Sequence, residues 1–112
     1  MFYPLGTKIK FIDSGKTGIG IVVAEEALYV QMVVGIVERL SSTDENWGWP
    51  IDHGLHINKE IAKKYNLTAF WSVGSDSPTE LISPAENTNS VSVELNSNLF
   101  VKRKHIELNT RN

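Results

Sequence analysis

Hydrophobic and polar residues alternate near the start of the chain, where Ile9 and Phe11 share one side of residues 7–12 and lysines occupy the other. Such alternation is typical of a half-buried β-strand. The stretch Ile19–Val23 is rich in β-branched residues, which favour a strand, and the intervening residues 13–18 have the composition of a turn. We therefore predict that the two strands form a β-hairpin.

The apolar stretch Ala27–Leu40 admits two interpretations. In a helix, Gln31, Gly35 and Glu38 would form one polar stripe. In a strand, its many valines and isoleucines fit a surface that is buried on both sides, and the β-branched residues and the glycine disfavour a helix. We predict one long strand, or two strands that meet at a bend near Gly35. The two apolar faces are then covered by the centre of a sheet or by a homodimer contact.

A short helix is the clearest element of the second half of the chain. Asn58 is a good N-cap, helix-forming residues follow it as far as Tyr65, and Asn66 can end the helix. The other predicted elements are a strand over residues 69–73 that places Trp71 in the core, a turn over 74–79, and a second hairpin with strands 91–95 and 99–106.

These elements define the expected fold class, which is mainly β with one short helix. Five to seven strands in a small chain suit a bent antiparallel sheet or a partly open barrel. The 112 residues contain no repeat or linker, so we expect a single domain over residues 1–112. A net charge of −2 argues against a general polyanion binder.

The chain contains no cysteine, which excludes disulfides, thiol nucleophiles and thiolate metal sites. The lack of cysteine also favours a reducing compartment. We identify no signal peptide, and the apolar stretches are too short to span a bilayer. A cytoplasmic protein without membrane contact is therefore expected.

The segment Asn46–Ile57 carries two of the three tryptophans and two of the three histidines, together with one proline and two glycines. Its composition indicates an irregular loop. Indole rings and imidazoles on a loop are typical of a binding surface, although one or both rings can instead fold back and cap the core. We expect the loop to face outward and to form a shallow groove for a small polar ligand or a protein segment. The expected ligand-binding residues are Trp47, Trp49, Asp52, His53 and His56.

Catalytic and metal-binding interpretations of the same loop are weaker. Asp52 beside His53 can be an acid–base pair, but neighbours on an extended segment point to opposite faces. His53 and His56 lack the spacing of a zinc-binding helix. The Gly15-Lys16-Thr17 triplet resembles the end of a phosphate loop, but a strand follows it where the motif needs a helix. We therefore predict no catalytic residue, no metal and no cofactor.

The leading functional hypothesis is a non-enzymatic binding module that forms a homo-oligomer. One alternative is a small hydrolase or lyase that uses His53 or His56 as a base and Asp52 or Asp44 to orient it. Another is a weak nucleic-acid-binding barrel that uses the basic run Lys102–His105 and the lysines of the predicted helix. Such a run more often protects an edge strand, and helix lysines usually face solvent, so we do not expect nucleic acid as a partner.

Overall fold

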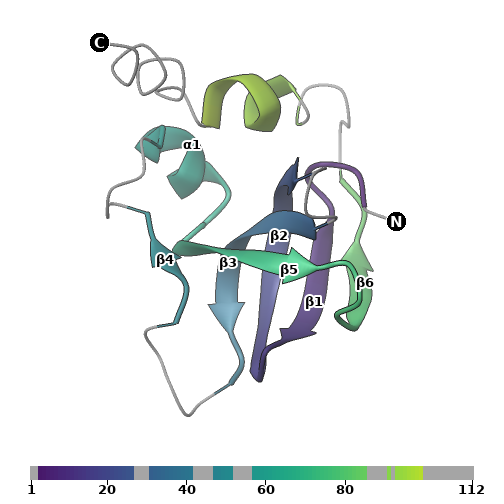
Figure 1. Cartoon of the computed structure of the whole chain (residues 1–112). Coiled ribbons are helices and arrows are strands. Elements are labelled where there is room, and N and C mark those ends of the chain that lie inside the picture. Colours follow the sequence, from purple (N-terminus) through teal and green to yellow (C-terminus); the bar gives the residue numbers. More distant parts are fainter. Residues whose placement is uncertain are drawn as a thin grey trace, which may run out of the picture.

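The computed structural model describes residues 3–26, 31–41, 47–51, 57–85, 91 and 93–99. Within these residues, six antiparallel strands form one sheet in the order β4-β5-β3-β2-β1-β6, and the sheet does not close into a barrel (Figure 1). This confirms the prediction of a mainly β fold built on a small bent antiparallel sheet. The elements are β1 (Lys8–Asp13), β2 (Lys16–Glu26), β3 (Gln31–Arg39), β4 (Trp49–Pro50), α1 (Lys59–Lys64), β5 (Ala69–Gly74), β6 (Thr79–Ser83) and the helical segment η2 (Glu94–Leu99).

The predicted first hairpin is present as β1 and β2. Asp13 pairs with Lys16, and the two residues between them, Ser14 and Gly15, have φ angles of 51° and 79°. A two-residue turn with two positive φ angles matches the twist of the flanking strands. The Gly-Lys-Thr triplet therefore belongs to a hairpin turn and to the start of β2, as predicted.

The predicted long strand is β3, which lies between β2 and β5 in the middle of the sheet. It has no break at Gly35. The irregularities lie in its pairing with β2, where the register shifts between Ile19 and Gly20 and again between Val22 and Ala24. Bulges of this kind bend and twist a sheet. The position of β3 also explains why its sequence is apolar on both faces.

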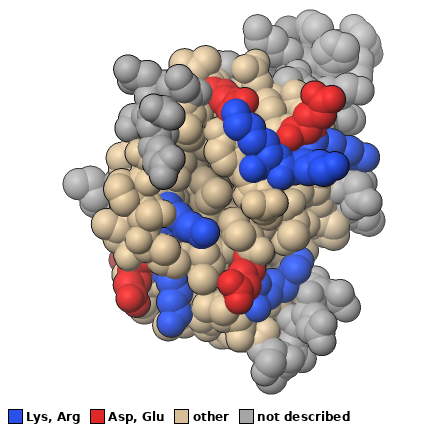
Figure 2. Space-filling model, turned by 180° about the vertical axis from the view of Figure 1, so that it is seen from behind, with Lys and Arg blue, Asp and Glu red and all other residues tan. Residues whose placement is uncertain are grey.

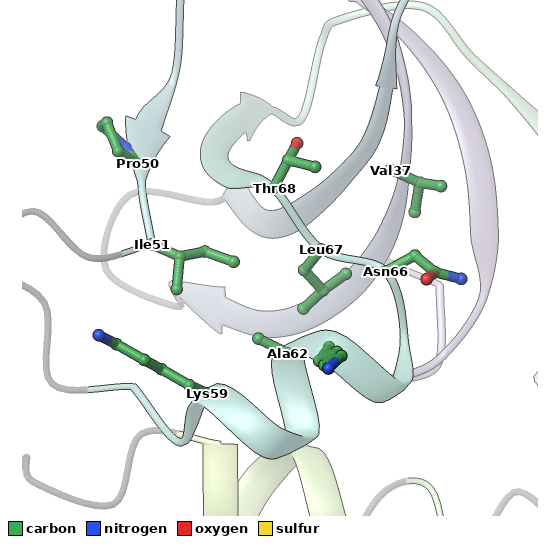
Figure 3. A pocket seen from close by; sticks show the side chains of 9 residues that line it. Val37, Pro50, Ile51, Lys59, Ala62, Asn66, Leu67 and Thr68 are labelled. Carbon is green, nitrogen blue, oxygen red and sulfur yellow. The ribbon is translucent and has the colours of Figure 1, made fainter.

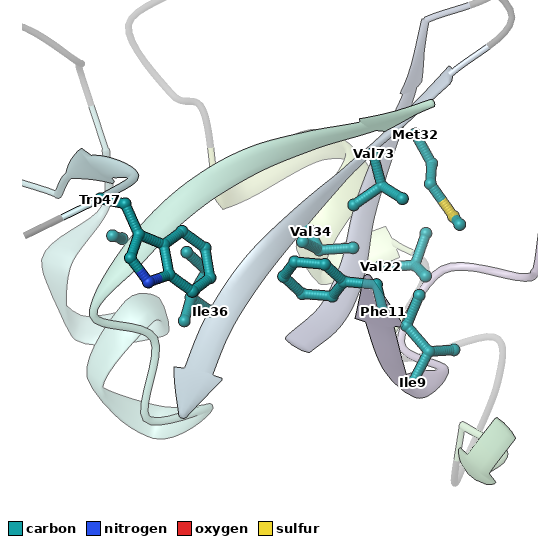
Figure 4. Packing of buried hydrophobic residues seen from close by; sticks show 9 residues of the cluster. Ile9, Phe11, Val22, Met32, Val34, Ile36, Trp47 and Val73 are labelled. Atoms are coloured by element: carbon teal, nitrogen blue, oxygen red, sulfur yellow. The ribbon is translucent and has the colours of Figure 1, made fainter. Parts of the chain in front are cut away.

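Two hydrophobic clusters cover the two faces of the sheet. On one face, nine buried side chains pack among themselves (Figure 4). On the other face, α1 and η2 lie together at one end of the sheet and cover a second cluster (Figure 1). The first cluster consists of Ile9, Phe11, Val22, Met32, Val34, Ile36, Trp47, Ala69 and Val73. The second consists of Val23, Ile61, Ala62, Leu67, Phe70, Leu95 and Leu99.

The predicted second hairpin is wrong over the residues that the structure describes. Residues 91 and 93–99 are helical, and the proposed second strand beyond Leu99 lies outside the described residues, as does the basic run Lys102–His105. Leu95 and Leu99, four residues apart, are fully buried, whereas Val93 is 59% exposed. Burial every fourth residue is a helical pattern, and the contacts with the sheet select it over the alternation that favoured a strand.

Candidate functional site

The two tryptophans of the predicted binding loop lie in different environments. Trp47 is 4% exposed and belongs to the core, whereas Trp49 is 56% exposed. Gly48 lies between them with a φ angle of 97°, a left-handed conformation that glycine adopts readily and that interrupts the extended backbone. The expectation that both rings face outward is therefore wrong for Trp47, which instead caps the core. Asp52, His53 and His56 lie outside the described residues.

Trp47 is held in the core by aromatic and cationic neighbours. Its ring meets Phe11 and Trp71 edge to face, with centroid distances of 6.1 Å and 5.4 Å. The Arg39 guanidinium lies 5.6 Å from the ring centroid, and Arg39 Nε donates a hydrogen bond of 2.9 Å to the Trp47 carbonyl oxygen. The indole Nε1 is buried without a hydrogen-bond partner in the described part of the chain. Trp47 therefore fixes the start of the Trp47–Ile51 segment to the sheet.

Trp71 lies half-buried against the same cluster, on β5. Its Nε1 donates a hydrogen bond of 2.8 Å to Asp13 Oδ2, and the Ser77 hydroxyl donates to Asp13 Oδ1. Asp13 ends β1 and Ser77 follows β5, so one carboxylate joins the first hairpin to the turn before β6. Hydrogen bonds to a charged acceptor are among the stronger ones in proteins.

Helix α1 begins and ends as its sequence predicts. The Asn58 side chain accepts hydrogen bonds from the backbone N–H groups of Glu60 and Ile61, at 3.0 Å and 3.2 Å. After the helix, Asn66 has a φ angle of 61°, the left-handed conformation that commonly ends helices. Together these residues set the start of α1 and the direction in which the chain leaves it toward β5.

A polar contact fastens α1 to η2. The Tyr65 hydroxyl donates a hydrogen bond of 2.6 Å to Glu94 Oε1, and Lys64 Nζ lies 3.1 Å from the same oxygen. Burial, with the hydrogen bond to Glu94 and its negative charge, raises the pKa of Tyr65 to about 12. The hydrogen bond from Tyr65, and next the contact with Lys64, lower the pKa of Glu94 from its ordinary value. The backbone N–H of Asn58 also donates to the Leu99 carbonyl at 2.8 Å.

A groove of about 710 Å³ lies between α1, the end of β4 and the end of β3 (Figure 3). Pro50 and Ile51 form one side, Val37 and Asn66 the other, and Ala62 and Leu67 lie between them (Figure 3). The lining residues are Val37, Pro50, Ile51, Lys59, Ala62, Lys63, Asn66, Leu67 and Thr68.

The floor of this groove depends on a close approach between two backbone segments. Leu67 is 6% exposed and packs against β3 at Gly35, where an added Cβ would lie 2.7 Å from both Leu67 δ-carbons. Only a glycine leaves room for Leu67 at this position. Leu67 therefore lies flat against the sheet and forms an apolar floor.

Two lysines contribute the positive charge of the groove. Lys59 and Lys63 are exposed, line the groove and have no ion-pair partner among the described residues. Figure 3 shows the Lys59 stem running along the wall below Pro50 and Ile51. Lys64, on the same helix, is instead paired with Glu94. The prediction that all three lysines face solvent is confirmed.

The described part of the predicted loop, residues 47–51, lies beside the groove. The described chain reaches Ile51 on one wall of the groove and resumes at Ile57, directly before the helix that forms another wall. Sequence reasoning missed Val37, Leu67 and the two groove lysines as site residues. They come from segments far apart along the chain, and no local motif joins them.

Within the described ranges, no three His, Asp or Glu side chains gather as a metal site would require. In the same part of the chain, no helix has the length and apolar character needed to cross a membrane. No protein-family model matches the chain, and neither a curated protein nor a solved structure matches it. The function of the site must therefore be inferred from the geometry of the site itself.

Proposed function

We propose that this protein is a non-enzymatic binding module that holds a small organic ligand in the groove between β4 and α1. One observation carries the proposal: a groove of about 710 Å³ with an apolar floor and a few polar side chains around it. Small-molecule sites usually have volumes of roughly 300–1,000 Å³ and this mixed lining. Trp49, exposed beside Pro50, adds an aromatic surface close by. The compartment that we propose is the cytoplasm.

The predicted loop supports this placement. Pro50 and Ile51, at the end of the described part of this loop, line the groove, and the exposed Trp49 directly precedes them. The proposal keeps Trp49 from the sequence prediction and assigns Trp47 to the core, where it supports the loop instead of contacting ligand.

Nucleic acid is a poorer candidate ligand. On the face in Figure 2, one group of Lys and Arg side chains lies at the upper right beside acidic side chains, and the others lie singly next to Asp or Glu. Binding to a phosphate backbone normally uses a broad positive face. The groove lysines suit a small ligand better.

A fragment screen followed by ¹⁵N NMR tests the proposal. We expect at least one small organic compound to shift the amide signals of Leu67, Ala62 and their neighbours in a saturable way. Val37→Phe should abolish these shifts because the added ring fills the groove from β3. Val93→Phe is the matched control, since Val93 is 59% exposed and does not line the groove. Shifts that are absent, or that survive Val37→Phe, would contradict the proposal.

Self-association through β6 is a second candidate, and it keeps the homo-oligomer prediction. β6 is an edge strand of the described sheet, and its Leu81 and Ile82 are 54% and 45% exposed. Apolar side chains on an open edge favour strand pairing with a second copy. Sedimentation at micromolar concentration should give a dimer that Leu81→Lys converts to the 12.5 kDa monomer. A wild-type monomer would exclude this candidate.

A further inference from the structure

We infer that the groove selects an organic anion whose acidic group lies between Lys59 and Lys63 and whose apolar body rests on Leu67. This inference rests on the proposed function and adds the chemical class of the ligand. Among the described lining residues, two are cationic and none is acidic. Glu60, the acidic residue of α1, does not line the groove.

The spacing of the two lysines favours a shared anion. Lys59 and Lys63 are four residues apart on α1, so their Cβ atoms are about 5–6 Å apart on the same side of the helix. Like charges at this spacing destabilise a helix. An anionic group between them removes that repulsion and gains attraction to both ammonium groups. Lys64 does not share this role, because Glu94 already neutralises it.

The hydrogen-bonding groups in the groove point to the same ligand class. The Thr68 hydroxyl donates its proton to the Ile36 carbonyl at 3.1 Å, so it can only accept a hydrogen bond from a ligand. The donors left in the lining are the two ammonium groups and the Asn66 amide, which makes no side-chain hydrogen bond to a described residue. The charged groups of the lining are thus both donors, and hydrogen bonds from charged donors suit an anion.

The apolar part of the ligand follows from the floor. Leu67 and Ala62 are buried side chains that still line the groove, and Val37 and Ile51 extend the same apolar surface. Contact with this surface removes apolar area from water, which favours binding. An inorganic anion has no apolar surface, so it cannot gain this hydrophobic contribution. The expected ligand is thus an amphipathic acid.

Two fluorescent probes with a common ring system test the inference. The first is 1-anilinonaphthalene-8-sulfonate, an anion, and the second is N-phenyl-1-naphthylamine, its uncharged counterpart. We expect the anion to bind about tenfold more tightly at low ionic strength, and the difference to shrink as salt screens the lysines. Inorganic phosphate alone should bind much more weakly than the anionic probe.

Variants of the three lysines test which side chains bind the anionic probe. Lys59→Gln and Lys63→Gln should each weaken binding of the anionic probe about three- to fivefold, the upper range for solvent-exposed charge pairs, and leave the uncharged probe unchanged. Lys64→Gln, on the same helix but outside the groove lining, is the matched control and should have no effect. Circular dichroism checks that each variant is folded.

The outcomes separate this inference from the proposed function. Equal affinity for both probes, or equal behaviour of all three lysine variants, would overturn the anion inference while binding in the groove stands. If neither probe shifts the NMR signals of the groove residues, both the anion inference and the proposed function are contradicted.

Discussion

The contact between Gly35 and Leu67 permits a quantitative test of the packing that forms the groove. Gly35 does not have a positive φ angle, so alanine can adopt its backbone conformation without strain. The new methyl group would lie 2.7 Å from both Leu67 δ-carbons. Carbon atoms in contact are normally about 3.5–4.0 Å apart, so Leu67 must move by roughly 1 Å.

Two opposing contributions determine how much Gly35→Ala changes the free energy of unfolding. Overpacking of this kind costs about 1–3 kcal/mol, whereas replacing a strand glycine by alanine gains roughly 0.5–1 kcal/mol. We therefore expect Gly35→Ala to lower the free energy of unfolding by about 0–2.5 kcal/mol. Leu67→Ala removes a buried side chain and should cost about 2–5 kcal/mol.

The double variant makes the prediction specific. In Gly35→Ala/Leu67→Ala the new methyl group enters the space that Leu67 vacates, so the glycine replacement should become neutral or slightly stabilising. The coupling between the two sites is then about 1–3 kcal/mol. Urea unfolding followed by tryptophan fluorescence measures each value, provided that the slopes agree among the variants.

Gly74→Ala is the matched control for this cycle. Gly74 also lies in a strand, and a Cβ there would meet its nearest neighbour, Ser77 Oγ, at an ordinary 3.6 Å. It should cause no loss by crowding and no coupling with Leu67. If the effects of Gly35→Ala and Leu67→Ala add to within about 0.5 kcal/mol, the close contact does not exist and the reasoning fails.

Four further predictions concern contacts outside the groove. The free energy of unfolding should fall as the pH drops below 4.5, the ordinary carboxyl pKa, because the pKa of Glu94 is lower in the folded state than in the unfolded chain. Urea titrations at several pH values measure this loss, and Glu94→Gln should reduce it. The free energy of unfolding should also fall between pH 10 and about 12, because Tyr65 has its ordinary pKa in the unfolded chain and a pKa of about 12 in the folded protein. An absorbance titration of the folded protein that gives an ordinary pKa for Tyr65 would contradict this. Asp13→Ala should cost about 1.5–3 kcal/mol because Trp71 Nε1 loses a charged acceptor, while Asp13→Asn, which keeps an acceptor oxygen, should cost less. Asn58→Ala should cost about 1 kcal/mol by removing the helix cap, and Asn58→Asp should restore most of it.

The elements that sequence predicted best are those with strong local signals. The first hairpin has both an alternating pattern and Ser14-Gly15, a pair that readily adopts two positive φ angles. Helix α1 has a cap at Asn58 and a stop at Asn66. In β3, the density of β-branched residues decided correctly between strand and helix.

The sequence predictions were wrong or incomplete where contacts between distant parts of the chain determine the secondary structure. The Val-x-Val-x-Leu pattern from Val91 favours a strand, yet burial of Leu95 and Leu99 against the sheet stabilises a helical segment. β6 was not predicted because it has only five residues and is mostly exposed, so its hydrophobic pattern carries little information.

The candidate site shows the same limit. Two indole rings on one irregular loop suggested that Trp47 and Trp49 act together. The positive φ angle of Gly48 interrupts the extended backbone between them, and no local pattern reveals it. The groove lining joins Val37, Pro50 and Leu67 from separate parts of the chain, so it became visible only in the fold.

The differing surroundings of the three indoles give the molecule an internal optical reporter. Trp49 is solvated beside the groove, whereas Trp47 and Trp71 lie edge to face at 5.4 Å inside the sheet. Rings so close should couple in the near-ultraviolet circular dichroism spectrum, which will follow the integrity of the core. Red-shifted emission comes from Trp49, so its quenching can be followed during a titration without labelling the protein.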